Sequence, residues 1–338
     1  MNGKERRWRF ALDVSICVAM TKVLIIGAGH AGGSAAGLLR QYGFEGEIVL
    51  AGQEAAAPYQ RPPLSKAWLK GEAGLEDLLL RPESFYAEQN IDLRTGVTAT
   101  AIDADAKSVT FADGTVEAYD VLILATGSNP FILPVPGNRL EGVIAYRDIA
   151  DTEMMMQTAR THSHAVVIGG GLLGLEAANG LRQRGMNVTV VHLADWLLER
   201  QLDRTAGELL KQALEARGIR FRLNEQTEEL HDYGSGRVCA VQFKSGDTIP
   251  ADLVVMAAGV RPNTELAEKA GLPCNRGILV DDCLQTYDPR VYAVGECANH
   301  RGIAYGLVAP LFEQAQVCAN HLAMLGTARY QGSVISTK

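Results

Sequence analysis

Two glycine-rich turns constrain the fold of this chain more than any other feature of its sequence. Each has the spacing GxGxxG and lies between an apolar strand and a helix, the context that this motif needs to bind a dinucleotide. The first glycine permits a tight turn, the second lets the backbone approach a pyrophosphate, and the third lets the helix pack closely on the strand. The helix N-terminus then directs free N–H groups at the phosphates. Two such turns predict two dinucleotide sites.

The first unit comprises a strand, the three glycines, a helix and a second strand, namely Val23–Ile26; Gly27, Gly29 and Gly32; Ser34–Gln41; and Glu47–Ala51. Its apolar, partly β-branched strands are typical of a buried parallel sheet. A side chain just beyond the second strand should bind the adenosine ribose of the ligand. Either Gln53 or Glu54 fits that position.

The second unit repeats this order with His164–Ile168; Gly169, Gly171 and Gly174; Leu175–Arg184; and Val188–Val191. It ends at His192 and Leu193. A single GxGxxG could be a simple tight turn, but here both motifs carry the flanking strands and helix that dinucleotide binding requires.

Two more apolar strands, Val121–Gly127 and Leu253–Gly259, end in small residues and glycine. Small residues let a chain pass close to a bound dinucleotide. A further strand within Thr286–Glu296 ends in Gly295-Glu296, where the carboxylate can accept a hydrogen bond from a sugar-like hydroxyl of a flavin.

Composition excludes several other classes of function. The length of 338 residues predicts about two domains. A net charge of −7 argues against nucleic acid and anionic membranes as partners, and no apolar stretch is long enough to span a bilayer. The six cysteines form no CxxC pair, which indicates reduced thiols of a cytoplasmic protein and no metal site.

The first 20 residues form a separate segment. Basic residues precede a short apolar stretch, Phe10–Met20, which is the order found in a signal peptide. Asp13 interrupts the apolar stretch and no cleavage site is clear. We expect a disordered extension over residues 1–20, ahead of an internal start at Met20.

The whole set of motifs, over residues 22–338, resembles the pyridine nucleotide–disulfide oxidoreductase superfamily. The resemblance implies an α/β fold of two Rossmann-like domains of the glutathione reductase type, with FAD on the first glycine turn, NAD(P)H on the second and the flavin ribityl chain at Glu296. It implies a discontinuous FAD domain (21–130 and 261–325), an inserted NAD(P)H domain (131–260) and, at 326–338, the start of a C-terminal interface domain that is otherwise missing.

The segment PYQRPPLSKAWL (58–69) looks like the ferredoxin, putidaredoxin and rubredoxin reductase branch. There the lysine, here Lys66, lies near the reactive edge of the flavin, and Glu176 occupies the position that pairs with it. A cation beside the flavin stabilises negative charge on its reduced form. The plainer alternative is a surface lysine and a helix-face glutamate.

Other segments, namely FILPVPG, GGGLLGLEAA, ERQLD and GECANHRGIAYGLVAPLFEQA, are closer to the flavin module of the nitrite reductase large subunit and to the electron-transfer subunit of assimilatory nitrate reductase. With Lys66 and Glu176 as catalytic residues, the predicted cofactor-binding residues are Gly27, Gly29, His30, Ala31, Gly32, Gln53, Glu54, Arg61, Lys66, Ala99, Ala125, Thr126, Gly127, Arg147, Gly169, Gly171, Leu172, Leu173, Gly174, His192, Ala258, Gly259, Gly295, Glu296 and Val308.

Three departures from the family pattern matter. No cysteine lies between Gly52 and Lys66, where disulfide reductases carry their redox thiol, so we expect flavin to pass electrons directly to a partner centre. His192 replaces the acid that would favour NADH, so NADH and NADPH both remain open. The chain ends where the family continues into a domain that forms one wall of the flavin site and often a homodimer interface, so we expect a fragment or a module that needs a partner.

The sequence therefore predicts an FAD-dependent oxidoreductase that passes electrons from NAD(P)H to an iron–sulfur or sirohaem centre in nitrite or nitrate assimilation. A first alternative is a free-standing NAD(P)H–rubredoxin or ferredoxin reductase. A second, of another class, is a redox-responsive binding protein of the apoptosis-inducing-factor type. A third is an inactive truncated product.

Overall fold

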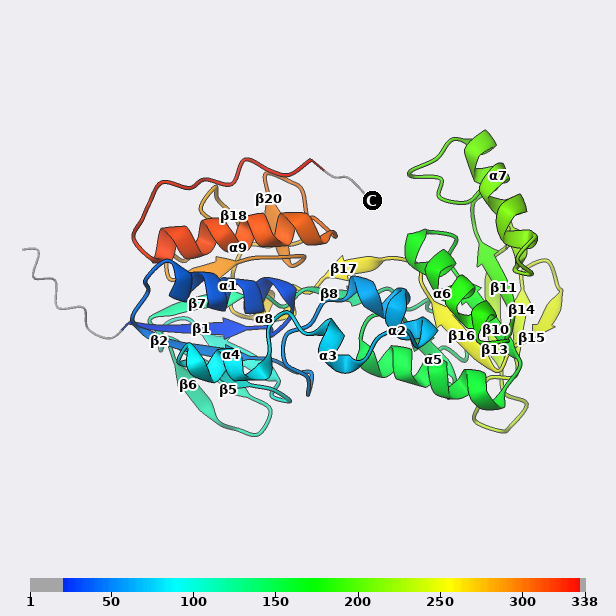
Figure 1. The fold of residues 1–338 in the computed structure, drawn as a ribbon, viewed down its shortest axis with the longest axis horizontal. Helices are drawn as coiled ribbons and strands as arrows, with labels where there is room; N and C mark the ends of the chain where they lie inside the picture. The colour runs from blue at the N-terminus through cyan, green and yellow to red at the C-terminus, as the bar shows by residue number, and fades with distance from the viewer. Residues whose placement is uncertain (1–20, 335–338) are drawn as a thin grey trace, which may run out of the picture.

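Two five-stranded parallel sheets organise the part of the chain that the structure, a computed structural model, describes: residues 21–334 (Figure 1). The predicted extension at 1–20 and the last residues of the predicted C-terminal segment, 335–338, lie outside it. The sheets form two bodies side by side, each covered by helices. The predicted α/β fold with two Rossmann-like parallel sheets is confirmed. No helix within 21–334 is long and apolar enough to cross a membrane.

The first sheet has the order β19-β7-β1-β2-β3. Its strands are β1 (Lys22–Ile26), β2 (Glu47–Ala51), β3 (Ile91–Arg94), β7 (Val121–Leu124) and β19 (Val291–Ala293). One face is covered by α1 (His30–Gln41) and α9 (Val308–Leu322), which pack on each other, with α4 (Glu83–Glu88) beside β3. The other face is covered by the antiparallel sheet of β4 (Ala99–Asp103), β5 (Ser108–Phe111) and β6 (Val116–Ala118).

The uninterrupted apolar run of β1 follows from this double cover. Val23 and Ile25 belong to the core shared with α1 and α9, whereas Leu24 and Ile26 belong to the core shared with β4 and β5. Because successive side chains of a strand point to opposite faces, a strand that is buried on both faces must be apolar throughout.

The second sheet has the order β12-β11-β10-β16-β9. Its strands are β9 (Val143–Ala145), β10 (His164–Ile168), β11 (Asn187–His192), β12 (Arg220–Leu223) and β16 (Leu253–Met256). Helices α5 (Ile149–Thr161) and α6 (Leu172–Gln183) share one core with it, and α7 (Arg204–Glu215) packs near β12. An antiparallel sheet of β13 (Thr227–His231), β14 (Ala240–Phe243) and β15 (Thr248–Pro250) covers the other face.

The chain crosses between the two sheets on a pair of antiparallel strands, β8 (Ser128–Pro130) and β17 (Val260–Pro262). After β17 it returns to the first sheet through α8 (Glu265–Lys269), β18 (Ile278–Val280), β19, β20 (Ala298–His300) and α9. The first sheet therefore contains strands from both ends of the described chain, because β19 pairs with β7.

A third connection is made by a segment between β2 and β3, which contains the 3-10 helix η1 (Pro62–Ser65), α2 (Ala67–Lys70) and α3 (Leu75–Leu78). Although it leaves the first sheet, α2 packs on α5 and α6 (Figure 1). Leu69 is fully buried in the core of the second sheet. A Cβ on Gly180 of α6 would lie 2.3 Å from Leu69 Cδ2, so this glycine allows the close approach.

Both helices that follow the glycine turns begin earlier than predicted. Helix α1 begins at His30 rather than Ser34, and α6 spans Leu172–Gln183 rather than Leu175–Arg184. Glycine has a low helix propensity, which hides these first turns from sequence. They are helical because the third glycine of each motif must lie there to let the helix approach its strand.

Candidate functional site

The first glycine of each motif is held in a conformation that other residues rarely adopt. Gly27 has a φ of +115° and Gly169 a φ of +127°. A Cβ on Gly27 would lie 2.1 Å from the carbonyl oxygen of Ala125, and one on Gly169 would lie 2.3 Å from that of Ala257. Each turn therefore touches the end of the neighbouring parallel strand, β7 or β16, and requires glycine for both its angle and its packing.

The third glycine of each motif also admits no side chain. A Cβ on Gly32 would lie 1.9 Å from the carbonyl oxygen of Gly27, and one on Gly174 would lie 2.0 Å from that of Gly169. These contacts bring the first turn of each helix onto its own glycine loop, as the motif requires.

The second glycine of each motif differs, because a Cβ on Gly29 or Gly171 would meet nothing within 4 Å. These two glycines are the N-caps of α1 and α6, and neither helix has a side-chain hydrogen bond at its cap. First-turn N–H groups that lack a side-chain acceptor, beside backbone open to an approaching ligand, fit a bound pyrophosphate. The protein thus presents two such cradles, one on each sheet.

Small residues lie beside the first cradle. Ala125 and Gly127 follow β7, and Thr126 between them donates a hydrogen bond from its hydroxyl to the carbonyl oxygen of Asn263, 2.7 Å away. Gly295, after β19, donates its N–H to Gln314 Oε1 at 2.7 Å. A Cβ there would lie 2.9 Å from Ala31 Cβ. Beside the second cradle, the corresponding residues after β16 are exposed: Ala258 and Gly259.

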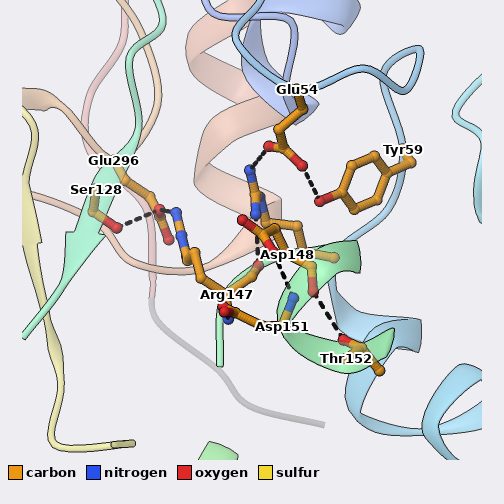
Figure 2. Close-up of polar contacts among 9 residues, drawn as sticks. Glu54, Tyr59, Ser128, Arg147, Asp148, Asp151, Thr152 and Glu296 are labelled. Atoms are coloured by element: carbon orange, nitrogen blue, oxygen red, sulfur yellow. Dashed lines mark hydrogen bonds and ion pairs between the residues drawn. The ribbon is translucent and has the colours of Figure 1, made fainter. Parts of the chain in front are cut away.

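An ion pair links the end of β19 to the opposite body. The Arg147 guanidinium binds Glu296 Oε2, and Ser128 donates its hydroxyl to the same oxygen at 2.7 Å (Figure 2). Arg147 lies between β9 and α5, and Glu296 just after β19. Two residues that the resemblance assigns to FAD contacts are therefore in direct contact with each other, and Ser128 is a third group that sequence reasoning missed.

A second polar cluster distinguishes Glu54 from Gln53, the two residues predicted to bind the adenosine ribose. Glu54 accepts a hydrogen bond from Tyr59 Oη at 2.5 Å (Figure 2). It accepts a second from Arg61 Nη2, also at 2.5 Å. Burial raises the pKa of Tyr59, so its hydroxyl keeps the proton that it donates. Arg61 also donates to the carbonyl oxygen of Arg147 at 2.5 Å. Gln53 is exposed, which leaves its amide as the freer group at the end of β2.

His30 lies at the first position of α1, where it is 7% exposed. Its ring meets the Phe312 ring edge to face, with centroids 5.1 Å apart. Burial, with a smaller contribution from the charge of Arg61, lowers the pKa of His30 to about 4. The ring is therefore neutral near pH 7. Two further predicted residues, Ala99 and Val308, are half-buried at the starts of β4 and α9.

The structure brings Lys66 and Glu176 together across the two bodies. Lys66 Nζ lies 3.1 Å from Glu176 Oε1, with Lys66 between η1 and α2 and Glu176 on α6. Ser65 donates its hydroxyl to the other carboxylate oxygen of Glu176. Sequence reasoning missed Ser65, although its place beside the lysine in PPLSK was a usable signal. Leu172 and Leu173 are exposed on the first turn of α6.

At the end of β11, His192 joins the second glycine loop to a later segment. Its Nδ1 accepts a hydrogen bond from the Gly170 N–H at 3.1 Å, and its Nε2 lies 3.0 Å from Glu199 Oε2. Glu199 belongs to the connection between β11 and α7 and was not among the predicted site residues.

Among residues 21–334, no cluster of histidine, cysteine and acidic side chains is arranged to hold a metal ion. The five described cysteines are all free thiols. Burial raises the pKa of Cys274 to about 11, and burial also raises the pKa of the fully buried Cys297. These thiols therefore stay protonated, unlike the thiolates that carry redox chemistry.

The family model for pyridine nucleotide-disulphide oxidoreductases matches residues 21–321. Among curated relatives, nitrite reductase [NAD(P)H] of Bacillus subtilis (strain 168) is 52% identical over 294 residues, which cover 87% of this chain and 36% of the relative. The assimilatory nitrate reductase electron transfer subunit of the same organism is 46% identical over 290 residues, covering 86% and 37%. The chain thus spans little more than a third of either relative.

Among solved structures, the covalent putidaredoxin reductase–putidaredoxin complex matches with a TM-score of 0.86 and 36% identity, covering 90% of this chain and 75% of that one. This chain therefore shares its fold with that reductase over most of its length, including both glycine turns. The chain belongs to the pyridine nucleotide-disulphide oxidoreductase family of flavin enzymes, which use FAD and NAD(P)H.

Proposed function

We propose that this chain is the NAD(P)H-oxidising flavin module of an assimilatory nitrite or nitrate reductase and passes electrons to an iron–sulfur or sirohaem centre. The observation that carries the proposal is its 52% identity over 294 residues with nitrite reductase [NAD(P)H]. The match to the nitrate reductase electron transfer subunit supports the same assignment. We place the acceptor centre outside residues 21–334, because no group of histidine, cysteine and acidic side chains there is arranged to hold a metal ion.

In this proposal FAD binds the cradle at Gly29 and NAD(P)H binds the cradle at Gly171. The FAD domain then comprises residues 21–130 and 261–325, with the NAD(P)H domain at 131–260. Glu296 would hold the flavin ribityl chain, with Arg147 and Ser128 fixing its carboxylate.

Bound flavin supplies the redox chemistry, because it accepts a hydride equivalent from reduced nicotinamide and returns electrons to an acceptor. The residues of the chain supply charge and position. Lys66 places a cation at the junction of the two bodies, where it would stabilise negative charge on a reduced flavin. Glu176 fixes that cation, and the hydroxyl of Ser65 fixes Glu176.

The acceptor should receive electrons directly from the flavin. No cysteine lies between Gly52 and Lys66, where a thiol relay would need one. Of the described cysteines, two are fully buried with their pKa raised, and none lies on η1 or α2.

Anaerobic titration of the FAD-loaded chain with NADH and with NADPH tests the first half of the proposal. Bleaching of the flavin absorbance by at least one nucleotide is expected, and an unbleached flavin would contradict it. The second half is tested by adding acceptors to the reduced chain. A nitrite reductase core with its iron–sulfur and sirohaem centres should reoxidise the flavin faster than rubredoxin does, with ferricyanide as a control for general reactivity.

A second candidate function is a reductase of a free-standing ferredoxin or rubredoxin. The superposition on putidaredoxin reductase in complex with putidaredoxin favours it, because that match covers 90% of this chain. In the acceptor experiment this function predicts the opposite order, with the small iron–sulfur protein reoxidising the flavin faster than the nitrite reductase core.

A further inference from the structure

An acidic side chain, that of Glu199, lies at the end of β11 although it is not adjacent to that strand in sequence. In nucleotide folds of this kind, an acidic residue at the end of the second strand bonds the 2′-hydroxyl of the adenosine ribose. Here that position is His192, which has no negative charge to offer. Its Nε2, however, lies 3.0 Å from the carboxylate of Glu199, seven residues further along the chain.

The hydrogen bonds of His192 define what it presents to Glu199. The backbone N–H of Gly170 can only donate, so Nδ1 of the ring must accept and carries no hydrogen in that contact. The hydrogen of the neutral ring then lies on Nε2 and is donated to Glu199 Oε2. His192 thus holds the carboxylate without cancelling its charge.

The segment that carries Glu199 is anchored on the second glycine loop. Leu198 donates its N–H to the carbonyl oxygen of Gly170 at 3.2 Å. Leu197 is fully buried and lies so close that a Cβ on Gly170 would be 3.0 Å from its Cδ2. The position of Glu199 relative to the loop is therefore set by two neighbouring residues in addition to the contact with His192.

Among the described residues, Glu199 has no ion-pair partner other than His192. Asp195 is paired with Arg204, and Glu225 lies 3.6 Å from Arg222. The second oxygen of Glu199, Oε1, has no hydrogen-bond partner among the described residues, and the side chain of Glu199 is 35% exposed. An exposed carboxylate oxygen can accept a ribose hydroxyl, and it repels a phosphate group.

We propose that Glu199, held by His192, makes the second nucleotide site selective for NADH over NADPH. Its free oxygen accepts the 2′-hydroxyl of the adenosine ribose, and its charge disfavours the 2′-phosphate of NADPH. This inference rests on the proposed role of the second cradle as the NAD(P)H site. The opposing possibility is the neighbouring Arg200, which is exposed and whose cation would instead favour the 2′-phosphate.

Calorimetric binding of ADP-ribose and of 2′-phospho-ADP-ribose to the FAD-loaded chain tests the inference without any hydride transfer. The wild-type chain should bind ADP-ribose at least roughly tenfold more tightly, the ratio expected from about 1.4 kcal/mol of charge repulsion. Glu199→Gln removes the charge at nearly constant volume and should bring the ratio close to one. Arg200→Gln, a matched change at the next residue, should leave the ratio unchanged.

Equal or tighter wild-type binding of 2′-phospho-ADP-ribose would overturn the inference, as would a ratio that follows Arg200→Gln rather than Glu199→Gln. If neither compound binds, the second cradle is not a nucleotide site and the inference is wrong. Rapid-mixing reduction of the flavin by NADH and NADPH distinguishes a failure of the proposed function from a failure of the selectivity. If neither nucleotide reduces the flavin but ADP-ribose still binds selectively, the proposed function fails and the selectivity of the site stands.

Discussion

Lys66 occupies the junction between the two bodies of the protein, and its environment distinguishes it from an ordinary surface lysine. Its partner Glu176 accepts from Lys66 on one oxygen and from Ser65 on the other. Exposed ion pairs of this kind add little to stability. The pair therefore has more to contribute through the position of the cation than through folding energy.

If Lys66 has the proposed role, Lys66→Met should leave FAD bound and slow its reduction by NAD(P)H roughly ten- to a hundredfold, because a cation beside the reduced flavin would be lost. The measurement is rapid-mixing absorbance of the flavin under anaerobic conditions. Lys70→Met, which removes an exposed lysine at the end of α2, is the matched control and should reduce at the wild-type rate. Equal rates for the two variants would contradict a role for Lys66.

His30 predicts a pH dependence of stability. Its pKa of about 4 in the folded chain lies below the ordinary value of 6.5, so between these values the unfolded chain binds more protons than the folded one. The stability from His30 is complete above pH 6.5 and is lost as the pH falls toward 4. Between pH 7.5 and pH 5, the FAD-free chain should lose about 2 kcal/mol more than His30→Gln, measured by denaturant unfolding. Parallel losses would show that His30 is not buried as described.

The sequence predicted single site residues that belong to a motif. It did not predict residues whose role depends on a contact with a distant part of the chain. Arg147 and Glu296 each follow from the resemblance, but their ion pair joins residues 149 positions apart on different bodies. Glu54 and Gln53 were equivalent in sequence, and only the contacts of Glu54 with Tyr59 and Arg61 separate them. Glu199 lies in the ERQLD segment that carries part of the resemblance, but the sequence did not place it at the nucleotide site, because its contact with the second glycine loop runs through His192.

At the scale of elements, each glycine turn contains positions packed against backbone and a position that is open. The first and third glycines of each motif touch backbone carbonyl oxygens, whereas the second faces open space. Strands β2 and β10 have the bounds that the sequence predicts, since glycine or serine flanks each of these mostly apolar runs. The starts of α1 and α6 were missed because their first turns contain glycine.

This difference predicts that alanine substitutions at two neighbouring glycines change the free energy of unfolding by very different amounts. Gly27→Ala should destabilise the FAD-free chain by roughly 2 kcal/mol or more, because alanine is strained at a positive φ and its Cβ would overlap the carbonyl oxygen of Ala125. Gly29→Ala, two residues further on, has a φ of −89° and free space and should be nearly neutral. Denaturant midpoints of the two variants check this, and equal midpoints would contradict the packing described for the turn.

At the scale of the molecule, the two bodies are joined by more than their crossing strands. Besides β8 and β17, the segment of η1 and α2 leaves the first sheet and buries Leu69 in the core of the second. The resemblance implied the contact of Lys66 with Glu176, but the burial of Leu69 that accompanies it was not predicted, because the apolar residues of PPLSKAWL do not specify which core they enter. This docking brings Lys66 to Glu176, the pair for which we propose a role beside the flavin.

We propose above that the two cradles bind different ligands, FAD at Gly29 and NAD(P)H at Gly171. Valine at either position meets no protein atom at its Cβ but would obstruct a pyrophosphate, so the pair of variants separates the sites with little effect on the fold. The most direct measurement is the flavin absorbance of each purified variant before and after anaerobic addition of NADH. Gly29→Val should be colourless, and Gly171→Val should be yellow and remain unbleached. A yellow Gly29→Val, or a Gly171→Val that NADH bleaches at the wild-type rate, would contradict the account.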